Sequence, residues 1–378
     1  MDRVNDFAFK IATANGTGSA SANGLIMQAI FRMGIPVTGK NVFPSNIQGL
    51  PTWYEIRVSK HGYTARTPHF DLMVALNAAT YAKDVAEVRS GGWLLYDSSW
   101  PLDEKLRRPD ITYLGVPLAE LCNAAFKGVR ERILMKNIAY AGALAGLLGI
   151  DTEVIRTLTH EKFAKKPALL DSNDKAIALG FNAVKDHHAC PLPIRLEPMD
   201  ATRDSILIDG NTAAGLGCVY AGATVGAWYP ITPSTSLMEG FKSFCQKFRV
   251  DRETKKNRYA IIQVGYELAA IGMVIGASWA GARAFTPTSG PGISLMNEFI
   301  GLAYYAEVPA VVVKARAPAH DAPMTIPTAA SSSSAWRIAK RFFFVSGSRR
   351  YFRQKPLNAS ISEVAGVIGY HAPTVAPA

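Results

Sequence analysis

Hydroxyl side chains gather in one proline-bounded segment of the sequence, YPITPST at residues 229–235. Its two prolines fix the backbone and stop a strand from continuing. Thr232, Ser234 and Thr235 are thereby held beside the start of a helix expected from Leu237. Hydroxyls placed in this way suit a carboxylate or the polar edge of a cofactor. An ordinary N-capping turn has the same composition, and the spacing alone leaves both interpretations open.

A single carboxylate, Glu267, stands at the head of an apolar segment. It follows a strand expected over residues 259–264 and opens a helix, residues 267–279, that is otherwise uncharged. The helix dipole favours a carboxylate at that position, which is the simplest explanation for it. Because a helix of such small and apolar residues is expected to be buried, a carboxylate on it would also need a specific partner.

A glycine-rich turn, GTGSAS at residues 16–21, lies between an expected strand at 7–12 and an expected helix at 25–33. A dinucleotide-binding turn would have a third glycine, where Ser21 stands, and an acidic residue about 20 positions further on. Both are missing, which disfavours a nicotinamide or flavin dehydrogenase. A phosphate, a carboxylate or coenzyme A remains open at this helix start, as does a turn needed only for packing.

The order of the expected elements predicts an α/β fold in two domains. Strands alternate with helices over residues 1–185, which indicates a parallel sheet covered on both faces, and a second α/β domain follows at 204–315. Residues 186–203 contain three prolines and the pair His187-His188, and they are predicted to form a solvated linker rather than a metal site. Residues 316–378 have a Ser, Ala, Pro and Arg bias without any helix or strand period, which predicts a basic tail of low order.

The composition disfavours several classes of protein. The 378 residues carry a net charge of +11, but residues 314–378 hold nine Lys/Arg against two acids, so residues 1–313 carry only +4 and do not indicate nucleic-acid binding. No apolar run reaches the roughly 18 residues of a membrane span, and the N-terminus shows no secretory signal, so a cytoplasmic location is expected. The four cysteines are too far apart for a zinc or iron–sulfur motif, and no metal site is predicted.

Four motifs occur in an order that resembles a known family: DGNTAA at 209–214, YPITPST at 229–235, ELAAIGM at 267–273 and TSGPG at 288–292. They resemble the α subunit of the 2-oxoacid:ferredoxin oxidoreductases, closest to the 2-oxoglutarate type. Residues 16–59, with FPSNIQG at 43–49, resemble the γ domain fused ahead of α in that family.

This resemblance implies a γ-type domain over residues 1–185 and an incomplete thiamine pyrimidine-binding domain with a parallel sheet over 204–315. It implies an oxidoreductase of the EC 1.2.7 class. Such enzymes oxidatively decarboxylate a 2-oxoacid to an acyl-CoA with coenzyme A, thiamine diphosphate and ferredoxin.

The resemblance also supplies roles for the matched residues. Glu267 falls where the family places the glutamate that contacts N1′ of the thiamine aminopyrimidine, and sharing a proton there promotes formation of the ylid. Thr232 falls where the family's threonine approaches the substrate carboxylate, so these two are the expected catalytic residues. The residues expected at the cofactor are Glu267, Tyr229, Pro230, Thr288 and Ser289, and those expected at the substrate are Thr232, Ser234 and Arg316.

Two motifs of the complete enzyme are missing from this sequence: the GDG motif that holds the diphosphate and Mg²⁺, and a cysteine cluster for electron transfer. In the family a separate β subunit holds the diphosphate, Mg²⁺ and a [4Fe–4S] cluster. The resemblance therefore implies that β subunit, ferredoxin, coenzyme A and the 2-oxoacid as partners, and thiamine diphosphate as a cofactor shared between the subunits.

The sequence departs from the family after residue 313. KARAPAH at 314–320 stands where the family has a conserved loop, and Arg316 lies one residue earlier than the family's substrate arginine. A shifted reading frame would produce such a change, and the later domains of the family would then be missing. The alternative function is therefore a truncated remnant that only folds or binds the β subunit.

Overall fold

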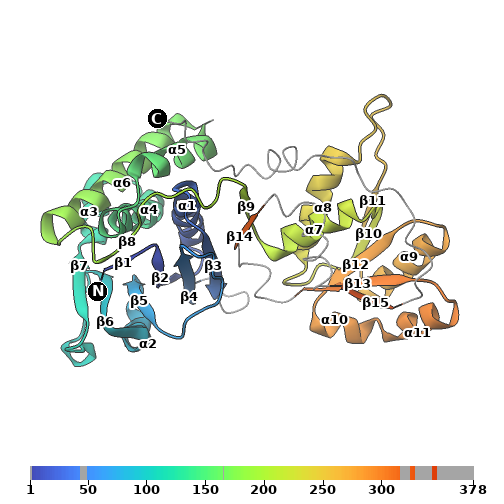
Figure 1. Cartoon of the computed structure of the whole chain (residues 1–378), viewed down its shortest axis with the longest axis horizontal. Coiled ribbons are helices and arrows are strands. Elements are labelled where there is room, and N and C mark those ends of the chain that lie inside the picture. The colour runs from blue at the N-terminus through green and yellow to red at the C-terminus, as the bar shows by residue number, and fades with distance from the viewer. Residues whose placement is uncertain (1, 43–48, 165, 316–323, 328–342, 347–378) are drawn as a thin grey trace. The chain divides into compact units, whose positions relative to one another are not determined.

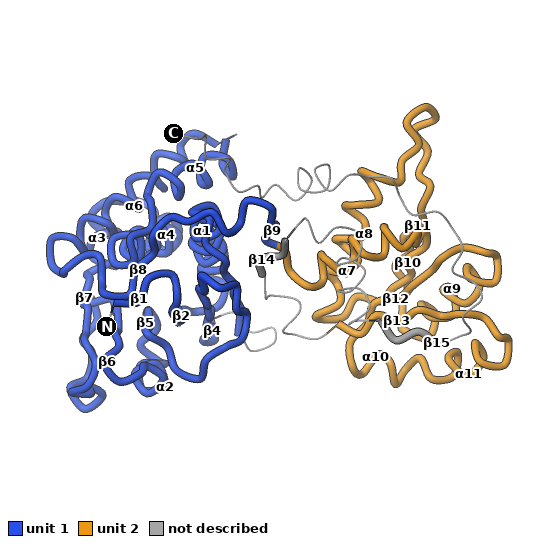
Figure 2. Tube along the Cα trace, viewed as in Figure 1, with its two compact units in different colours: residues 1–207, 371–378 blue, residues 208–370 orange. Residues whose placement is uncertain are grey.

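The structure is a computed structural model of the 378-residue chain. It describes residues 2–42, 49–164, 166–315, 324–327 and 343–346, the last two segments by their backbone. The chain divides into two compact units, residues 1–207 with 371–378 and residues 208–370 (Figure 2). Within the described residues, no helix is long and apolar enough to cross a membrane.

A mixed sheet forms the centre of the first unit, with strands in the order β7-β6-β5-β2-β4-β3 (Figure 1). Strands β5, β6 and β7 continue the sheet parallel to β2, as predicted, whereas β4 runs antiparallel to both β2 and β3. The purely parallel sheet expected here is therefore corrected to a parallel-rich one. The bounds are β2 (Asp6–Ala14), β3 (Val37–Val42), β4 (Pro51–Ser59), β5 (Phe70–Ala75), β6 (Val88–Asp97) and β7 (Thr112–Val116).

Alternating side chains of β2 divide the core of this unit between the two faces of the sheet. Phe7, Phe9 and Ile11 pack with residues of α1 and α4, while Ala8 packs with residues of α2 on the other face. Helix α5 packs against α1, and α6 packs against α4. The bounds are α1 (Ser19–Arg32), α2 (Tyr81–Glu87), α3 (Leu118–Ala125), α4 (Val129–Leu148), α5 (Thr152–Phe163) and α6 (Pro167–His187), with short 3₁₀ turns η1 (Ala78–Thr80) and η2 (Glu104–Leu106).

Helices α4 and α6 approach each other so closely that their backbones are in contact. A Cβ atom added at Gly142 would lie 2.1 Å from the carbonyl oxygen of Ile177, and one added at Gly180 would lie 1.8 Å from that of Ala139. Backbone atoms cannot move aside as a side chain can, so only glycine fits at these two positions.

The solvated linker predicted over residues 186–203 is not what the structure shows: residues 186 and 187 end α6, and the segment after them, residues 188–207, packs on the first unit. Strand β8 (Ile194–Arg195) pairs in parallel with β1 (Arg3–Val4), and the Met199 amide donates to the Met33 carbonyl oxygen at 2.9 Å. Leu192, Ile194 and Leu196 are buried in the core of the first unit. The prolines fix an extended backbone, but the apolar residues between them make this segment pack on the unit instead of bridging solvent.

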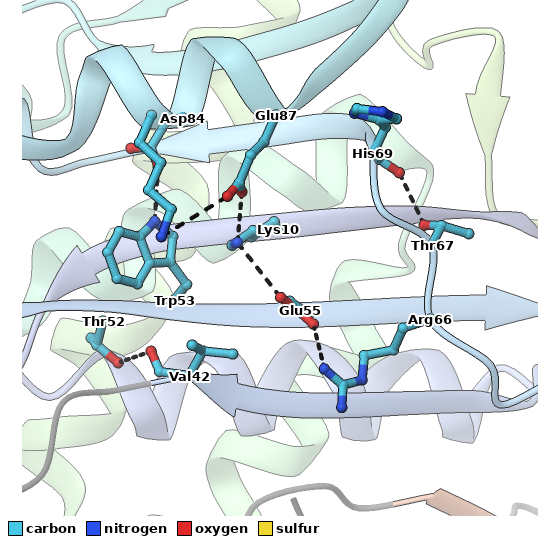
Figure 3. A network of polar contacts seen from close by, with 11 residues as sticks. Lys10, Val42, Thr52, Trp53, Glu55, Arg66, Thr67, His69, Asp84 and Glu87 are labelled. Atoms are coloured by element: carbon cyan, nitrogen blue, oxygen red, sulfur yellow. Dashed lines mark hydrogen bonds and ion pairs between the residues drawn. The ribbon is translucent and has the colours of Figure 1, made fainter.

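A charged network lies on the α2 side of the sheet (Figure 3). The Lys10 ammonium, on β2, is 2.6 Å from the Glu87 carboxylate of α2 and 3.5 Å from the Glu55 carboxylate of β4. It also lies over the rings of Trp53 and Phe70, at 5.6 and 5.0 Å from their centroids. These contacts satisfy a lysine that is almost completely buried, and they tie α2 to two strands.

Asp84 of α2 is buried beside this network. Its carboxylate accepts hydrogen bonds from Thr80 Oγ1 at 2.6 Å and from Trp53 Nε1 at 2.8 Å. Burial raises the pKa of Asp84 to about 6, although both donors oppose that shift because they favour the ionised form. Near neutral pH the first unit therefore holds a buried carboxylate that is close to taking up a proton.

The second unit contains a sheet in the order β11-β10-β12-β13-β15, of which the first four strands are parallel (Figure 1). Phe285 packs with α7 and α8 on one face, while Ala227 packs with α9 and α11 on the other. The sheet is therefore covered on both faces. The bounds are α7 (Gly210–Tyr220), β10 (Val225–Trp228), α8 (Thr235–Phe248), β11 (Ala260–Gln263), α9 (Glu267–Trp279), β12 (Ala284–Thr288), α10 (Gly290–Leu295), α11 (Asn297–Tyr305) and β13 (Ala310–Lys314). Strand β9 (Ser205–Ile208) spans the border between the two units.

Two short strands occur in the segment for which no regular structure was predicted: β14 (Met324–Pro327) and β15 (Phe343–Ser346). The backbone of β15 pairs antiparallel with β13, with Val311 opposite Val345. Its aromatic and β-branched residues have high strand propensity, a local signal that the overall Ser and Arg bias of the segment obscured. The rest of the predicted tail, including Arg316, lies outside the described residues.

Candidate functional site

The predicted site residues follow neighbouring parallel strands of the second unit at the points where those strands end. Thr232 lies in the turn after β10, Glu267 follows β11, and Thr288 and Ser289 close β12. Because β11, β10 and β12 are adjacent and parallel, their carboxyl ends meet at one edge of the sheet. Thr232 and Glu267 therefore both lie at the carboxyl ends of parallel strands, which is where open α/β sheets bind ligands.

The turn at residues 229–235 holds its hydroxyls in two different ways. Thr232 is exposed, and its hydroxyl makes no hydrogen bond within the described part of the chain. Ser234, by contrast, is fully buried, and its hydroxyl donates to the Ile231 carbonyl oxygen at 2.8 Å. Thr232 is therefore the hydroxyl that is free for a ligand, whereas a substrate contact donated by Ser234 would require that internal bond to break. Tyr229 and Pro230 are half-buried at the start of the turn.

Glu267 is only 5 % exposed at the start of α9. Among the described residues, none makes a hydrogen bond or an ion pair with its carboxylate. An unpaired carboxylate is expensive to bury. The helix dipole contributes about 0.3–1 kcal/mol at such a position, which is small beside the cost of burying a charge. This carboxylate therefore has the environment expected of one that hydrogen-bonds to a bound ligand.

Thr288 adjoins Glu267 through the start of α10. A Cβ atom added at Gly292 would lie 1.9 Å from Thr288 Oγ1 and 3.2 Å from Glu267 Cγ, so both side chains border the space that this glycine leaves free. Thr286 Oγ1 and Thr288 Oγ1 are buried, and neither has a hydrogen-bond partner in the described structure. Each such buried polar group costs about 1–3 kcal/mol when left unsatisfied.

Helix α9 is less buried than its composition predicted. Its inner stripe, including Ala270 and Val274, lies in the core, but Met273 is 42 % and Trp279 is 71 % exposed. A helix on the outside of a sheet buries only the stripe that faces it, so an apolar sequence alone does not bury the whole helix. The expectation of a wholly buried helix is corrected, although Glu267 and Ala270 in its first turn are buried.

The thiols take no part in this site. Cys122, Cys218 and Cys245 are buried and free, and Cys190 is half-buried and free. Burial raises the pKa of the Cys122 thiol to about 11 and that of Cys245 to about 12. Thiols with such pKa values are almost entirely protonated at neutral pH and behave as small apolar groups.

The residues present fit the aminopyrimidine half of thiamine diphosphate. A buried unpaired carboxylate suits a ring nitrogen that shares a proton with it, and the unpartnered hydroxyls of Thr286 and Thr288 suit further polar atoms of a ligand. Thr286 was not predicted as a site residue, because its hydroxyl becomes notable only once the fold buries it without a partner. Within the described residues, no group of three His, Cys, Asp or Glu side chains could hold a metal ion.

The fold and the site together define the class of this protein: an α/β protein with a candidate ligand site at the carboxyl edge of its second sheet. Two family models match the chain in succession: pyruvate ferredoxin/flavodoxin oxidoreductase over residues 8–183, and the thiamine diphosphate-binding part of pyruvate flavodoxin/ferredoxin oxidoreductase over residues 216–349. The chain belongs to the 2-oxoacid:ferredoxin oxidoreductase family and corresponds to its α subunits.

Similar proteins of known name agree with this assignment. The α subunit of 2-oxoacid:ferredoxin oxidoreductase 2 from Aeropyrum pernix is 28% identical, covering 81% of this chain and 54% of that protein. The 2-oxoglutarate synthase subunit KorA from Methanocaldococcus jannaschii is 46% identical, but over 106 residues, 28% of this chain and 26% of that protein. The solved 2-oxoglutarate:ferredoxin oxidoreductase from Magnetococcus marinus matches with a TM-score of 0.73 at 28% identity, covering 82% of this chain and 52% of that one.

The chain thus spans about half the length of the curated relatives that it matches along most of its own sequence. The family resemblance inferred from the four motifs is confirmed. The individual roles expected for Glu267, Thr232 and the other site residues remain predictions, as do the domain limits and the shifted reading frame.

Proposed function

We propose that this chain is the fused γ-α part of a thiamine-dependent 2-oxoacid:ferredoxin oxidoreductase, active in the cytoplasm with a β subunit. The complex would oxidatively decarboxylate a 2-oxoacid, with 2-oxoglutarate favoured, to an acyl-CoA and transfer the electrons to ferredoxin. The observation that carries the proposal is the buried, unpaired Glu267 beside Thr288 at the carboxyl edge of a parallel sheet. The preference for 2-oxoglutarate draws support from the identity to a KorA subunit.

The proposed mechanism assigns one task to each group of residues. Glu267, a residue that is only 5 % exposed, would hold the proton shared with N1′ of the aminopyrimidine. The free hydroxyl of Thr232 would donate to the substrate carboxylate and orient it. Thiamine diphosphate, when bound, supplies the electron sink for decarboxylation. Residues that would border it are Tyr229, Pro230, Thr286, Thr288 and Ser289.

An exposed apolar surface supports a β subunit as partner. Besides Met273 and Trp279 of α9, the side chains of Leu302, Tyr304 and Tyr305 on α11 are exposed. Apart from Glu267, α9 carries no charged residue. Aromatic side chains and methionine are enriched at protein–protein interfaces. To that subunit we assign the diphosphate, Mg²⁺ and the [4Fe–4S] cluster.

The test is co-expression with a matching β subunit, followed by coenzyme A-dependent reduction of a viologen dye with 2-oxoglutarate, pyruvate or a branched 2-oxoacid. Reduction with one of these substrates is expected. A complex that forms and binds thiamine diphosphate but reduces no dye would contradict the proposal and favour the truncated remnant, which would still bind the β subunit.

The substitution Glu267→Gln tests the assigned role within that complex. It should lower turnover by roughly 10²–10⁴-fold, because the amide cannot share the N1′ proton as a carboxylate does. Thiamine diphosphate should still bind, and exchange of its C2 proton should slow together with turnover. Glu239→Gln, at an exposed position of α8 on the other face of the sheet, is the matched control and should leave both rates unchanged. If the C2 proton exchanges at the wild-type rate in Glu267→Gln, Glu267 is only a carboxylate at a helix start and has no catalytic role.

A further inference from the structure

Asn211, the second residue of α7, is 2 % exposed, and its side chain leaves its own helix. The start of α7 does not need it, because Asp209 caps that end by accepting from the Thr212 amide at 2.9 Å. Asn211 Nδ2 instead donates to the Pro233 carbonyl oxygen at 2.7 Å and to Ser236 Oγ at 2.9 Å. Both acceptors belong to the segment that carries Thr232.

Few other hydrogen bonds hold that segment, residues 230–236, in place. Pro230 and Pro233 have no backbone N–H, so they cannot donate to the rest of the fold. The amide and hydroxyl of Ser234 close the turn on itself at the Ile231 carbonyl oxygen. The segment runs into α8, where the Leu237 amide donates to the Ser234 carbonyl oxygen at 3.1 Å. Among the hydrogen bonds of the described residues, those from Asn211 are the ones that tie residues 230–236 to an element other than α8.

The two helices on which this tie depends are fixed against each other. A Cβ atom added at Gly215 of α7 would lie 2.7 Å from the Phe241 amide nitrogen and 2.9 Å from the Leu237 carbonyl oxygen of α8. A Cβ atom added at Gly240 would lie 3.3 Å from Thr212 Cα. Backbones in such contact cannot slide, so the Asn211 amide meets the turn from a rigid base.

We propose that Asn211 is a positioning residue for Thr232. Its carboxamide fixes the carbonyl group of Pro233, the residue that follows Thr232, and thereby fixes the position of the Thr232 hydroxyl. The inference rests on the proposed function, in which that hydroxyl orients the substrate carboxylate. Only a donor group suits the site, because both contacts end on oxygen acceptors. A misplacement of about 1 Å in an orienting group is enough to cost on the order of 10²-fold in rate.

The first experiment needs no catalytic activity. Hydrogen exchange of the full chain should show faster exchange of the Ser234 and Leu237 amides in Asn211→Ala, by at least roughly tenfold, because the turn loses its tie to α7. Thr212→Val is the matched control: it removes a side-chain hydrogen bond to Asp209 on the same helical turn without touching residues 229–236. Equal exchange of these two amides in wild type and Asn211→Ala would overturn the positioning role.

The second experiment uses the complex with the β subunit. Asn211→Ala should lower kcat/KM for the 2-oxoacid by roughly 10–100-fold and leave the KM for coenzyme A unchanged. In a Thr232→Ala background the same change should cost less than about threefold, because the hydroxyl to be positioned is already gone. Thr212→Val, the control used for hydrogen exchange, should stay near the wild-type value.

Equal losses in both backgrounds would show that Asn211 does not act through Thr232. An inactive wild-type complex would instead refute the proposed function, while hydrogen exchange would still decide whether Asn211 holds the turn.

Discussion

Replacing Asp84 by asparagine should remove part of the pH dependence of stability of the first unit. Asp84 is 0 % exposed, and burial is the largest cause that raises its pKa from 3.8 to about 6. The donors Thr80 and Trp53 lower that pKa, while Glu87 raises it and Lys10 lowers it by their charges. Asparagine keeps the size and one acceptor oxygen but has no proton to gain or lose in this range.

The sign follows from the two pKa values. Because the folded-state pKa lies above the unfolded one, the folded protein keeps a proton that the unfolded chain releases. The resulting stabilisation is complete below about pH 3.8 and is lost as the pH rises through about 6. At about 1.36 kcal/mol per pKa unit the whole shift corresponds to roughly 3 kcal/mol, of which about 1.3 kcal/mol disappears between about pH 5 and pH 7.

Hydrogen exchange of the slowest β2 amides reports the free energy of unfolding of the first unit alone. Between about pH 5 and pH 7, wild type should lose about 1.3 kcal/mol more of that free energy than Asp84→Asn does. Glu104→Gln, an acid-to-amide change at a side chain that is 83% exposed, is the control and should follow wild type. If wild type and Asp84→Asn lose the same free energy over this range, the carboxylate does not titrate there and the argument from burial fails.

Two glycine substitutions test the close contacts. In Gly292→Ala the new Cβ would meet Thr288 Oγ1 at 1.9 Å, so calorimetry should show that the complex with the β subunit binds thiamine diphosphate at least roughly tenfold more weakly. Gly276→Ala on α9, where an added Cβ has nothing within 4 Å, is the control. Unchanged binding by Gly292→Ala would refute the site. Gly180→Ala should cost the first unit about 1–3 kcal/mol or more and lower its melting temperature, because the Cβ meets the Ala139 backbone. Gly24→Ala is the control: an added Cβ on this part of α1 has nothing within 4 Å, so the change should stabilise the first unit by about 0.5–1 kcal/mol. Similar melting temperatures for Gly180→Ala and Gly24→Ala would contradict the backbone contact between α4 and α6.

The boundaries of the elements around the candidate site in the second unit could be predicted closely from the sequence. The helix predicted over residues 267–279 is α9 with the same bounds, and the strand predicted over 259–264 is β11 at 260–263. Glycine, proline and changes of polarity mark the ends of these elements in the sequence itself. The site residues could be located for the same reason: in a parallel sheet, the residue after each strand lies at the ligand-binding edge.

Other features depend on contacts between distant residues and left no local signal. β4 alternates apolar and polar residues in a register that places Tyr54 and Ile56 in the core, yet nothing in its sequence shows that it runs antiparallel to β2. The tie from Asn211 to Pro233 spans 22 residues and appears only when α7 packs against α8. Thr286 resembles any strand threonine until burial deprives its hydroxyl of partners.

The packed segment at residues 188–207 determines where this polypeptide tolerates being divided into two separately produced pieces. A break after residue 185, where the prolines suggested a border, would strip Leu192, Ile194 and Leu196 from the first piece and leave their hydrophobic sites open to water and aggregation. The border between the units instead falls within β9, two residues before α7 begins, and Asp209 in that interval caps the helix. A split at Leu207 would therefore keep Leu192, Ile194 and Leu196 with the first piece and leave the second with a capped helix start.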